Sequence, residues 1–231
     1  MRVHVAFTPA EEVGAPVGVV VDVLRATSTI CQALAAGYRR VLCCAEIEQA
    51  REIAAREGHT VLAGERETVR IDGFDYGNSP REFVEPAAET LVLTTTNGTR
   101  LLLAAAARCE LVLVGSLLNL DAVVAEVQAR GEEVAVLCAG VLGELALDDT
   151  YCAGRIAEAL GGEPADSAVA AMRLARSFES AEAGLGSSQS ARNLLASGLD
   201  GDIVWCARES VLAAVPRFSR MLGPAAEVTL L

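Results

Sequence analysis

Residues 91–115 read LVLTTTNGTRLLLAAAARCELVLVG, and this stretch decides how the fold is assigned. A short apolar run passes into a turn rich in hydroxyl groups and then into a long Ala/Leu segment. Apolar runs of four to eight residues are typical of buried strands, and a longer run of good helix formers favours a helix. The stretch therefore predicts a strand at 91–94, a helix at 97–107 and a second strand at 111–114.

The turn of this stretch contains more hydrogen-bonding groups than a helix start requires. Its residues are Thr95, Thr96, Asn97, Gly98 and Thr99. One side chain is enough to cap a helix. The free N–H groups and the positive dipole end of a helix also bind anions, and glycine lets the backbone approach a ligand. Ordinary capping and phosphate binding both remain open for this turn.

The same pattern occurs 70 positions earlier in the chain. Residues 24–44, LRATSTICQALAAGYRRVLCC, align with residues 94–114, TTTNGTRLLLAAAARCELVLV. The turn Thr27-Ser28-Thr29 then corresponds to the threonine-rich turn. This predicts an internal duplication with halves at about 15–80 and 85–160. The alternative is that any two strand–helix–strand units look alike.

The remaining pattern alternates strands and helices along most of the chain. Predicted strands lie at 3–7, 17–23, 41–44, 60–63 and 134–138, and predicted helices at 26–36, 46–57, 121–130 and 148–160. Such alternation predicts a parallel sheet covered by helices. We expect a single α/β domain, 1–231, with three α/β/α layers and a mostly parallel sheet.

The C-terminal third is expected to be mainly helical. Predicted helices lie at 165–181 and 187–198, and a further helical stretch is expected to end at Pro216. Residues 202–207 are compatible with a strand or a helix start.

Composition narrows the classes of function. The chain has 231 residues, is 52% hydrophobic and carries a net charge of −12, which argues against a nucleic-acid partner. Its seven cysteines are scattered without a CxxC pair, which favours reduced thiols in a cytoplasmic protein. No apolar run reaches the length of about 18 residues that a membrane span needs. Ala/Val-rich surfaces lead us to expect a homodimer.

The buried-type strand at 17–23 contains a carboxylate. Asp22 lies at its end and Arg25 lies just beyond. In open α/β sheets, ligands bind at the carboxyl ends of strands. Asp22 is therefore a candidate metal ligand or phosphoryl nucleophile. The alternatives are a helix cap or an ion pair with Arg25.

A second acidic group occurs in GELALDDTYCAG, residues 143–154. Glu144 and Asp148 are four residues apart and would share a helix face, and Asp149 follows. Carboxylate oxygens suit Mg²⁺, although acidic residues are also common where a helix starts. The chain has only two histidines, which argues against a zinc site or a histidine-based triad.

Several motifs together resemble the 2-phosphosulfolactate phosphatase (ComB) family over nearly the whole chain. They are VDVLRATSTI (21–30), GERE (64–67), GFDYGNSP (73–80), TTTNGT (94–99), GSLLN (115–119), CAG (138–140), ALDDTYCAG (146–154) and the segment 190–216. The resemblance implies an α/β fold and a Mg²⁺-dependent phosphomonoesterase acting on phosphosulfolactate, a step toward coenzyme M. The family often has Glu-Asp at Asp148-Asp149 and Thr at Ser28, and neither difference removes the chemistry.

The motifs and the resemblance together give a predicted site. Asp22, Arg25 and Asp149 are the predicted catalytic residues, and Mg²⁺ is assigned to Asp22, Glu144, Asp148 and Asp149. The predicted substrate or phosphate contacts are Thr27, Ser28, Thr29, Arg66, Asn78, Ser79, Thr95, Thr96, Asn97, Gly98, Thr99 and Arg192.

Other functions remain open at this point. A non-catalytic anion-binding or regulatory protein would need the threonine turns but not the acidic group. A related phosphatase would use a different phosphorylated hydroxy acid. A metal-dependent lyase or isomerase would give a product without free phosphate.

Overall fold

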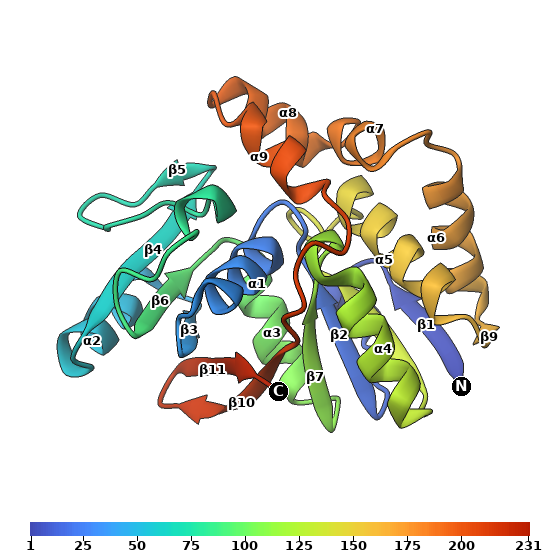
Figure 1. The fold of residues 1–231 in the computed structure, drawn as a ribbon, viewed down its shortest axis with the longest axis horizontal. Helices are drawn as coiled ribbons and strands as arrows, with labels where there is room; N and C mark the ends of the chain where they lie inside the picture. The colour runs from blue at the N-terminus through green and yellow to red at the C-terminus, as the bar shows by residue number, and fades with distance from the viewer.

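A computed structural model describes all residues, 1–231, and shows one sheet flanked by helices (Figure 1). The eleven strands have the order β5-β4-β6-β3-β11-β10-β7-β2-β8-β1-β9. They are β1 (Arg2–Ala6), β2 (Val17–Val21), β3 (Arg40–Cys44), β4 (Thr60–Arg66), β5 (Val69–Arg70), β6 (Thr90–Thr94), β7 (Leu111–Gly115), β8 (Val134–Cys138), β9 (Glu163–Pro164), β10 (Pro216–Leu222) and β11 (Ala225–Leu230). The predicted α/β class and mostly parallel sheet are confirmed.

Nine α-helices connect and cover these strands. They are α1 (Ala26–Ala36), α2 (Ile47–Arg56), α3 (Gly98–Ala106), α4 (Leu120–Arg130), α5 (Leu147–Leu160), α6 (Asp166–Arg176), α7 (Ala181–Gly186), α8 (Gln189–Ala196) and α9 (Asp200–Cys206). None of them combines the length and the apolar character that crossing a membrane would require.

Six of the parallel strands form two groups of three, and β1 and β9 extend the second group. One parallel group is β4-β6-β3 and the other is β8-β2-β7. Helix α1 carries the chain from β2 to β3, whereas α3 carries it from β6 back to β7. Each predicted strand–helix–strand unit therefore begins in one group and ends in the other. The strand order fits a twofold relation between the units, and common ancestry stays a prediction.

A C-terminal hairpin joins the two parallel groups, and the sequence reading of this region was wrong. Strand β11 pairs antiparallel with β3, and β10 pairs antiparallel with β7 (Figure 1). Pro216 begins a strand; it does not end a helix. Most of β10 is exposed or half-buried, so it lacks the apolar run of a buried strand. Glu227 on β11 is buried and accepts hydrogen bonds from two arginines. Arg40 is distant in sequence, on β3, and Arg220 lies across the hairpin on β10.

Two further predictions concern the C-terminal third. The predicted helix at 165–181 is too long: α6 ends at Arg176, and Ser180 caps a new helix, α7, by accepting from the Ala183 N–H at 3.1 Å. Of the strand and the helix start left open for residues 202–207, the helix is observed, since residues 202–206 lie in α9 and Ala207 is its C-cap. Polar caps within a helical pattern thus set boundaries that periodicity alone does not reveal.

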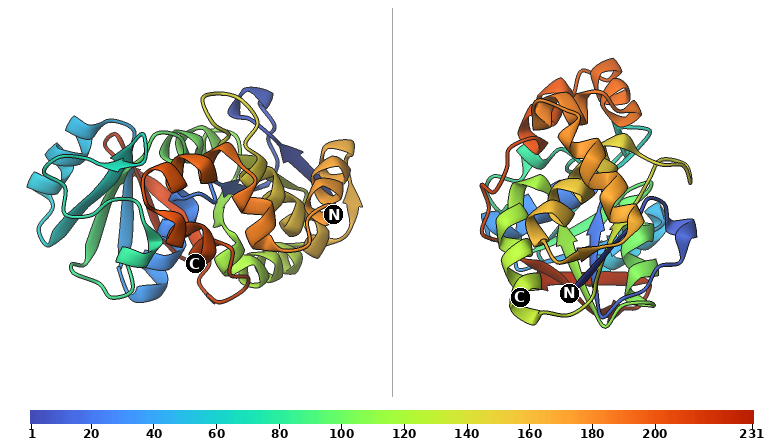
Figure 2. Two further views of the ribbon diagram at one scale, coloured as in Figure 1. Left: turned by 90° about the horizontal axis from the view of Figure 1, so that it is seen from above. Right: turned by 90° about the vertical axis from the view of Figure 1, so that its right-hand side faces the viewer.

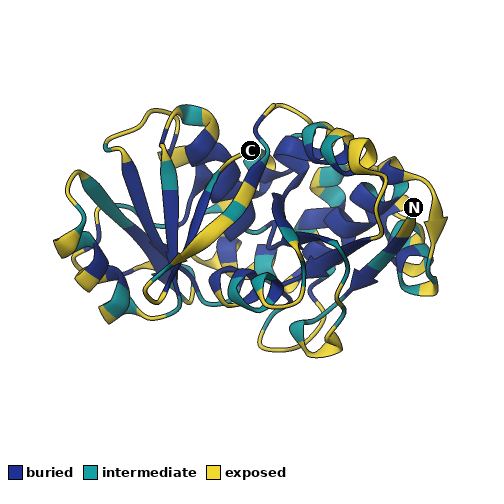
Figure 3. Cartoon of the chain, turned by 90° about the horizontal axis from the view of Figure 1, so that it is seen from below, coloured by how far each residue is buried: buried dark blue, intermediate teal, exposed yellow.

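Apolar packing fixes the two groups against each other. Every residue of β2 is buried, as the continuous β-branched run predicts for a strand covered on both faces (Figure 3). One core cluster packs α4, α5 and α6 on β1, β2 and β8. Another contains residues of α1 and α3 together with strands of both groups. Helices α1 and α3 therefore hold the two groups in a fixed relation.

The C-terminal helices lie over one edge of the sheet. Helices α8 and α9 lie at the top of Figure 1, and the view from above shows them crossing the middle of the molecule (Figure 2). Ser190 and Asn193 on α8 line the same cavity as Asp22, which follows β2. The carboxyl end of β2 is thus enclosed between the sheet and these helices.

Candidate functional site

The two hydroxyl-rich turns meet at Gly98. A Cβ atom added to Gly98 would lie 2.6 Å from the Asp22 Oδ2 and 2.6 Å from the Ala26 Cβ. Helix α1 begins at Ala26 and α3 begins at Gly98, so the two helices start side by side. Glycine is required here because any side chain would separate them. The turns that the sequence aligned therefore converge on one place.

Asp22 lies between these two helix starts and is buried. Burial, and then the charges of Asp148 and Glu65, raise its pKa to about 7, while the N–H groups of Ala26 and Gly98 act in the opposite direction. Backbone N–H groups at helix starts favour the ionised carboxylate, and the buried acids disfavour it. A carboxyl group with this balance changes its protonation near neutral pH.

Asp149, in the first turn of α5, connects the loop after β2 with the loop after β8 through hydrogen bonds. Its Oδ1 accepts the Val23 N–H at 2.9 Å, and its Oδ2 accepts the Gly140 N–H at 3.0 Å. Burial and the charges of Asp148 and Asp22 raise its pKa well above the ordinary value, against these two hydrogen bonds. Both carboxylate oxygens are already used inside the protein.

Asp148, the preceding residue, is also buried, and hydrogen bonds from backbone N–H groups and from the Ser190 and Ser188 hydroxyls favour its ionised form. Its Oδ1 accepts the Ser190 hydroxyl at 3.3 Å. Burial raises its pKa to about 6. Since Asp148 contributes to the raised pKa of Asp22, the two carboxylates lie close enough to repel each other. They form the acidic centre of the site.

Arg25 is held by a residue that the sequence reading did not select. Its Nη1 donates to the Asp202 Oδ2 at 2.7 Å, and the two side chains are 3% and 0% exposed. Ser79 donates its hydroxyl hydrogen to the other Asp202 oxygen at 2.5 Å. The predicted contact Ser79 thus acts on Asp202, which fixes the guanidinium at the cavity. Asp202 lies in the segment 190–216, which contributes to the family resemblance. Its position at the start of a possible strand or helix gave no separate reason to select it.

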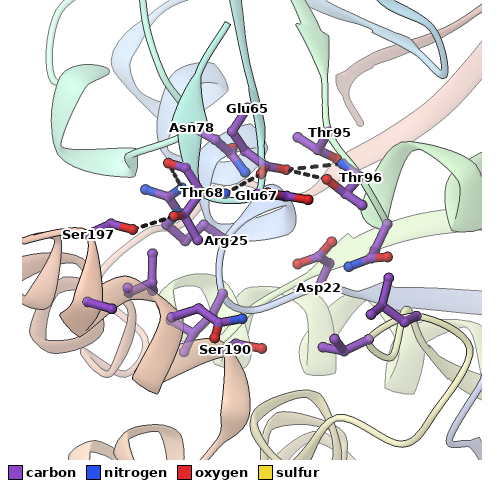
Figure 4. A pocket seen from close by; sticks show the side chains of 17 residues that line it. Asp22, Arg25, Glu65, Glu67, Thr68, Asn78, Thr95, Thr96, Ser190 and Ser197 are labelled. Atoms are coloured by element: carbon purple, nitrogen blue, oxygen red, sulfur yellow. Dashed lines mark hydrogen bonds between the residues drawn. The ribbon is translucent and has the colours of Figure 1, made fainter.

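Asp22 and Arg25 line a cavity of about 470 Å³ (Figure 4), whereas the predicted residues Asp148, Asp149 and Ser79 are buried outside its lining. Its walls come from the turns after β2 and β6, the β4–β5 turn, the loop after β8 and helix α8. The Asn78 Oδ1 and the Thr95 Oγ1 are buried without a hydrogen-bond partner. Both residues line the cavity. Buried polar atoms are nearly always paired, so these two are available for a ligand.

Glu65 is a second residue that the sequence reading did not select. Its Oε1 accepts from both the N–H and the hydroxyl of Thr96 at 3.1 Å. Its Oε2 accepts the Thr68 N–H at 2.9 Å (Figure 4). Glu65 therefore ties the β6–α3 turn to the β4–β5 turn. Its position in the GERE motif, next to Arg66, was the available signal.

Four predicted phosphate contacts are buried and use their hydroxyl groups internally. None of them lines the cavity. The interactions are Asp22 N–H to Thr27 Oγ1 (3.1 Å), Ser28 Oγ to Val23 O (2.8 Å), Thr29 Oγ1 to Asn78 O (3.0 Å) and Thr99 Oγ1 to Thr95 O (3.1 Å). These hydroxyls shape the turns, whereas Thr95 is the one with a free oxygen.

The structure separates Glu144 and Arg192 from the other predicted site residues. Glu144 is exposed on a tight turn in which it pairs with Val141. Arg192 is exposed on α8, where it donates to Gln189 and to the Ser187 carbonyl. Neither lines the cavity. The cavity instead brings together Asp22, Arg25, Asn78, Thr95, Thr96 and Asn97.

The acidic centre fits a small hard cation with few protein ligands. No three His, Cys, Asp or Glu side chains form a group that could hold a metal ion. Mg²⁺ takes one or two carboxylates, keeps several waters and is completed by substrate phosphate oxygens. Asp22 offers one such carboxylate at the cavity, and the unpartnered Asn78 Oδ1 is an oxygen donor of the same kind, whereas Asp148 is buried and does not line the cavity.

This arrangement defines a class of protein. An acid-containing cavity at the carboxyl end of a parallel strand, facing two helix N-termini, is the usual ligand site of an open α/β protein. The class is thus an α/β protein built to handle a small anionic ligand.

Comparison with known proteins gives the family. The family model described as 2-phosphosulpholactate phosphatase matches residues 4–220. A Thermus thermophilus protein named "Probable 2-phosphosulfolactate phosphatase" is 39% identical over 97% of this chain and 98% of its own. A Symbiobacterium thermophilum protein of the same name is 38% identical (93% and 96%), and the Methanothermobacter thermautotrophicus "2-phosphosulfolactate phosphatase" is 37% identical (94% and 92%). The chain belongs to the 2-phosphosulpholactate phosphatase family.

Proposed function

We propose that this protein hydrolyses the phosphate ester of 2-phospho-3-sulfolactate to sulfolactate and inorganic phosphate. The observation that carries the proposal is Asp22, held between the starts of α1 and α3 at a cavity with unpartnered oxygen donors. The names of the relatives supply the substrate.

The charges around the cavity support a requirement for a cation. Asp22, Glu65 and Glu67 line it, and its only lining arginine, Arg25, is already paired with Asp202. A phosphate dianion would therefore meet net negative charge. Mg²⁺ held by Asp22 would neutralise that charge and polarise the phosphoryl oxygens.

The reaction needs a new bond between a water oxygen and phosphorus, and cleavage of the phosphorus–oxygen ester bond. The leaving sulfolactate oxygen takes up a proton. Asp22 accepts the proton of the attacking water, since its carboxylate lines the cavity between the starts of α1 and α3. Arg25 holds the phosphoryl oxygens in line, because Asp202 keeps its guanidinium in one orientation.

Direct attack by Asp22 is the other route to the same products. The carboxylate oxygen would then bond to phosphorus, and water would hydrolyse the aspartyl phosphate in a second step. Quenching the enzyme during turnover with borohydride distinguishes the routes. Conversion of Asp22 to homoserine, found by mass spectrometry, would identify the covalent route.

The proposal is tested by phosphate release from a panel of phosphorylated hydroxy acids that includes phosphosulfolactate. We expect release with Mg²⁺, loss of release after treatment with EDTA, and recovery when Mg²⁺ is restored. Activity unchanged by thorough chelation would contradict the metal requirement. Calorimetric binding of the acids without any turnover would instead support an anion-binding protein. Product without free phosphate would indicate a lyase or isomerase.

A further inference from the structure

A second cavity, of about 310 Å³, adjoins the first. The two share Thr95, Thr96, Asn97 and Leu142 as lining residues, so they meet between the start of α3 and the loop after β8. Their charges are opposite. The lining of the second cavity contains Arg66 and Arg100 and no acidic residue. A ligand that spans both cavities therefore meets the acidic centre at one end and guanidinium groups at the other.

Arg66 forms no ion pair. Its guanidinium donates to the Glu65 carbonyl at 2.7 Å, the Ala45 carbonyl at 3.1 Å and the Thr94 hydroxyl at 3.0 Å. All three acceptors are uncharged. Arginine has five N–H donors, so two remain after these three bonds. Its positive charge is fixed in place without a counter-ion, in a chain whose net charge is −12.

Arg100 differs from Arg66 in this respect. It pairs with Glu46 at 2.8 Å, and the two side chains are 63% and 54% exposed. An exposed pair of this kind is weak, but it does place a carboxylate beside the guanidinium. Arg66 is therefore the cation in this cavity that an anionic ligand would neutralise.

Thr95 provides an independent indication of a ligand. It is 2% exposed, and its Oγ1 has no hydrogen-bond partner. It lines the first cavity (Figure 4) and the second as well. A hydroxyl in this position can donate to an anion in the second cavity.

We propose that the second cavity is the subsite for the sulfonate group of the substrate, and that Arg66 is the specificity residue that binds it. This rests on the proposed function. Phosphate and carboxylate oxygens are good ligands for Mg²⁺ and belong near Asp22. The sulfonate is a much weaker base that stays ionised. Its oxygens match the fork of a guanidinium, assisted by the Thr95 hydroxyl.

The test compares phosphosulfolactate with 2-phospholactate, which has a hydrogen atom in place of the sulfonate. We expect wild-type protein to prefer phosphosulfolactate. We expect Arg66→Gln to lower kcat/KM for phosphosulfolactate by about 10- to 100-fold, the loss typical of a charge-assisted hydrogen bond. The loss on 2-phospholactate should be at least about tenfold smaller by the same reasoning. The matched control is Arg39→Gln, in an exposed ion pair with Glu89 that lines neither cavity; it should change either value by less than about threefold, since exposed pairs contribute little.

A second variant keeps the proposal testable even if the Arg66→Gln protein does not fold. Because the Thr95 Oγ1 has no partner in the protein, Thr95→Val removes no internal hydrogen bond. It should also reduce the preference for phosphosulfolactate, by about five- to tenfold.

The outcomes separate the two proposals. Absence of phosphate release from both substrates by wild-type protein would refute the proposed function. Hydrolysis of both by wild-type protein, with equal losses in Arg66→Gln, would overturn the subsite and leave the phosphatase. Equal kcat/KM values of wild-type protein for the two substrates would overturn it as well.

Discussion

The β2–α1 turn and the β6–α3 turn occupy equivalent places in the strand order, but their side chains do different work. Their helices start in contact at Gly98. The first turn contributes the carboxylate of Asp22 and the guanidinium of Arg25. The second contributes Thr95 with a free hydroxyl and Asn97. A symmetric framework thus supplies two helix N-termini, and the unlike side chains divide the site into a reacting part and a hydrogen-bonding part.

The comparison also shows that several hydroxyl groups in a turn do not by themselves indicate a ligand site. In the first turn, Thr27, Ser28 and Thr29 all use their oxygens to hold the turn together. In the second turn, Thr99 does so and Thr95 does not. The surplus of hydroxyl groups in the sequence therefore marks the construction of two sharp turns more than it marks ligand contacts.

The largest effect is expected from removing the carboxylate of the first turn. Asp22→Asn should lower kcat by about 10³-fold, within the range for loss of an acid–base group. Phosphate release is the measurement. Asp121→Asn, at an exposed position on α4, is the control and should retain wild-type activity. A variant at Asp22 that keeps most of its activity would remove this residue from the reaction.

The next effect concerns the support of Arg25. Asp202→Asn leaves a buried guanidinium without its charged partner, which should reduce the free energy of unfolding by about 3 kcal/mol. Urea unfolding measures this loss, and kcat/KM should fall with it. The exposed pair Arg39–Glu89 supplies the control, because Glu89→Gln should cost less than about 1 kcal/mol. Equal stability of the two variants would contradict the role given to Asp202.

The contact between the two turns is tested by Gly98→Ala. The added Cβ would press on Asp22 and Ala26, so we expect a loss of about 1–3 kcal/mol in stability, as for overpacking. Activity should fall at least about tenfold, since small displacements of reacting groups are costly. Gly58→Ala is the control, because a Cβ there meets nothing within 4 Å. Wild-type activity in Gly98→Ala would show that the helix starts need not touch.

A pH dependence of stability is expected in the metal-free protein. Asp22 has its pKa raised from 3.8 to about 7 by folding, so the folded state binds the proton more tightly than the unfolded state. The stabilisation of the folded state by the protonated Asp22 carboxyl is fully present below about pH 3.8 and is lost as the pH rises to about 7. Relative to wild type, the Asp22→Asn variant should therefore become steadily more stable across this range.

Urea unfolding at a series of pH values measures that difference. Saturating Mg²⁺ should reduce it, because a bound cation favours the ionised carboxylate. A stability difference that does not vary between pH 4 and 7 would mean that folding leaves the pKa of Asp22 unchanged.

Much of the fold could be predicted because most strands and helices have strong local patterns. Strand β2 is a continuous apolar run, and β8 and α1 were assigned with their observed boundaries. The hairpin of β10 and β11 was missed, because β10 is largely exposed and β11 contains a buried glutamate. Both features are explained only by partners elsewhere in the sheet, such as Arg40 on β3.

The candidate site was predicted less completely for a similar reason. Asp22, Arg25 and Thr95 follow strands, and the position of strand ends in parallel sheets places them at one edge. Glu65 and Asp202 were not selected, since their roles depend on contacts with Thr96 and Arg25, which are distant in sequence. The expected homodimer stays a prediction.

The sequence by itself determined the alternation of strands and helices, the two hydroxyl-rich turns, and the family, because these depend on local pattern and on motifs. Only the tertiary structure decided which oxygens are free. Every hydroxyl and carboxylate in the turns can bond to backbone, side chain or ligand, and the choice depends on what packs against it. Thr95 is free and Thr99 is not because their neighbours differ, and those neighbours are set by the pairing of the two halves.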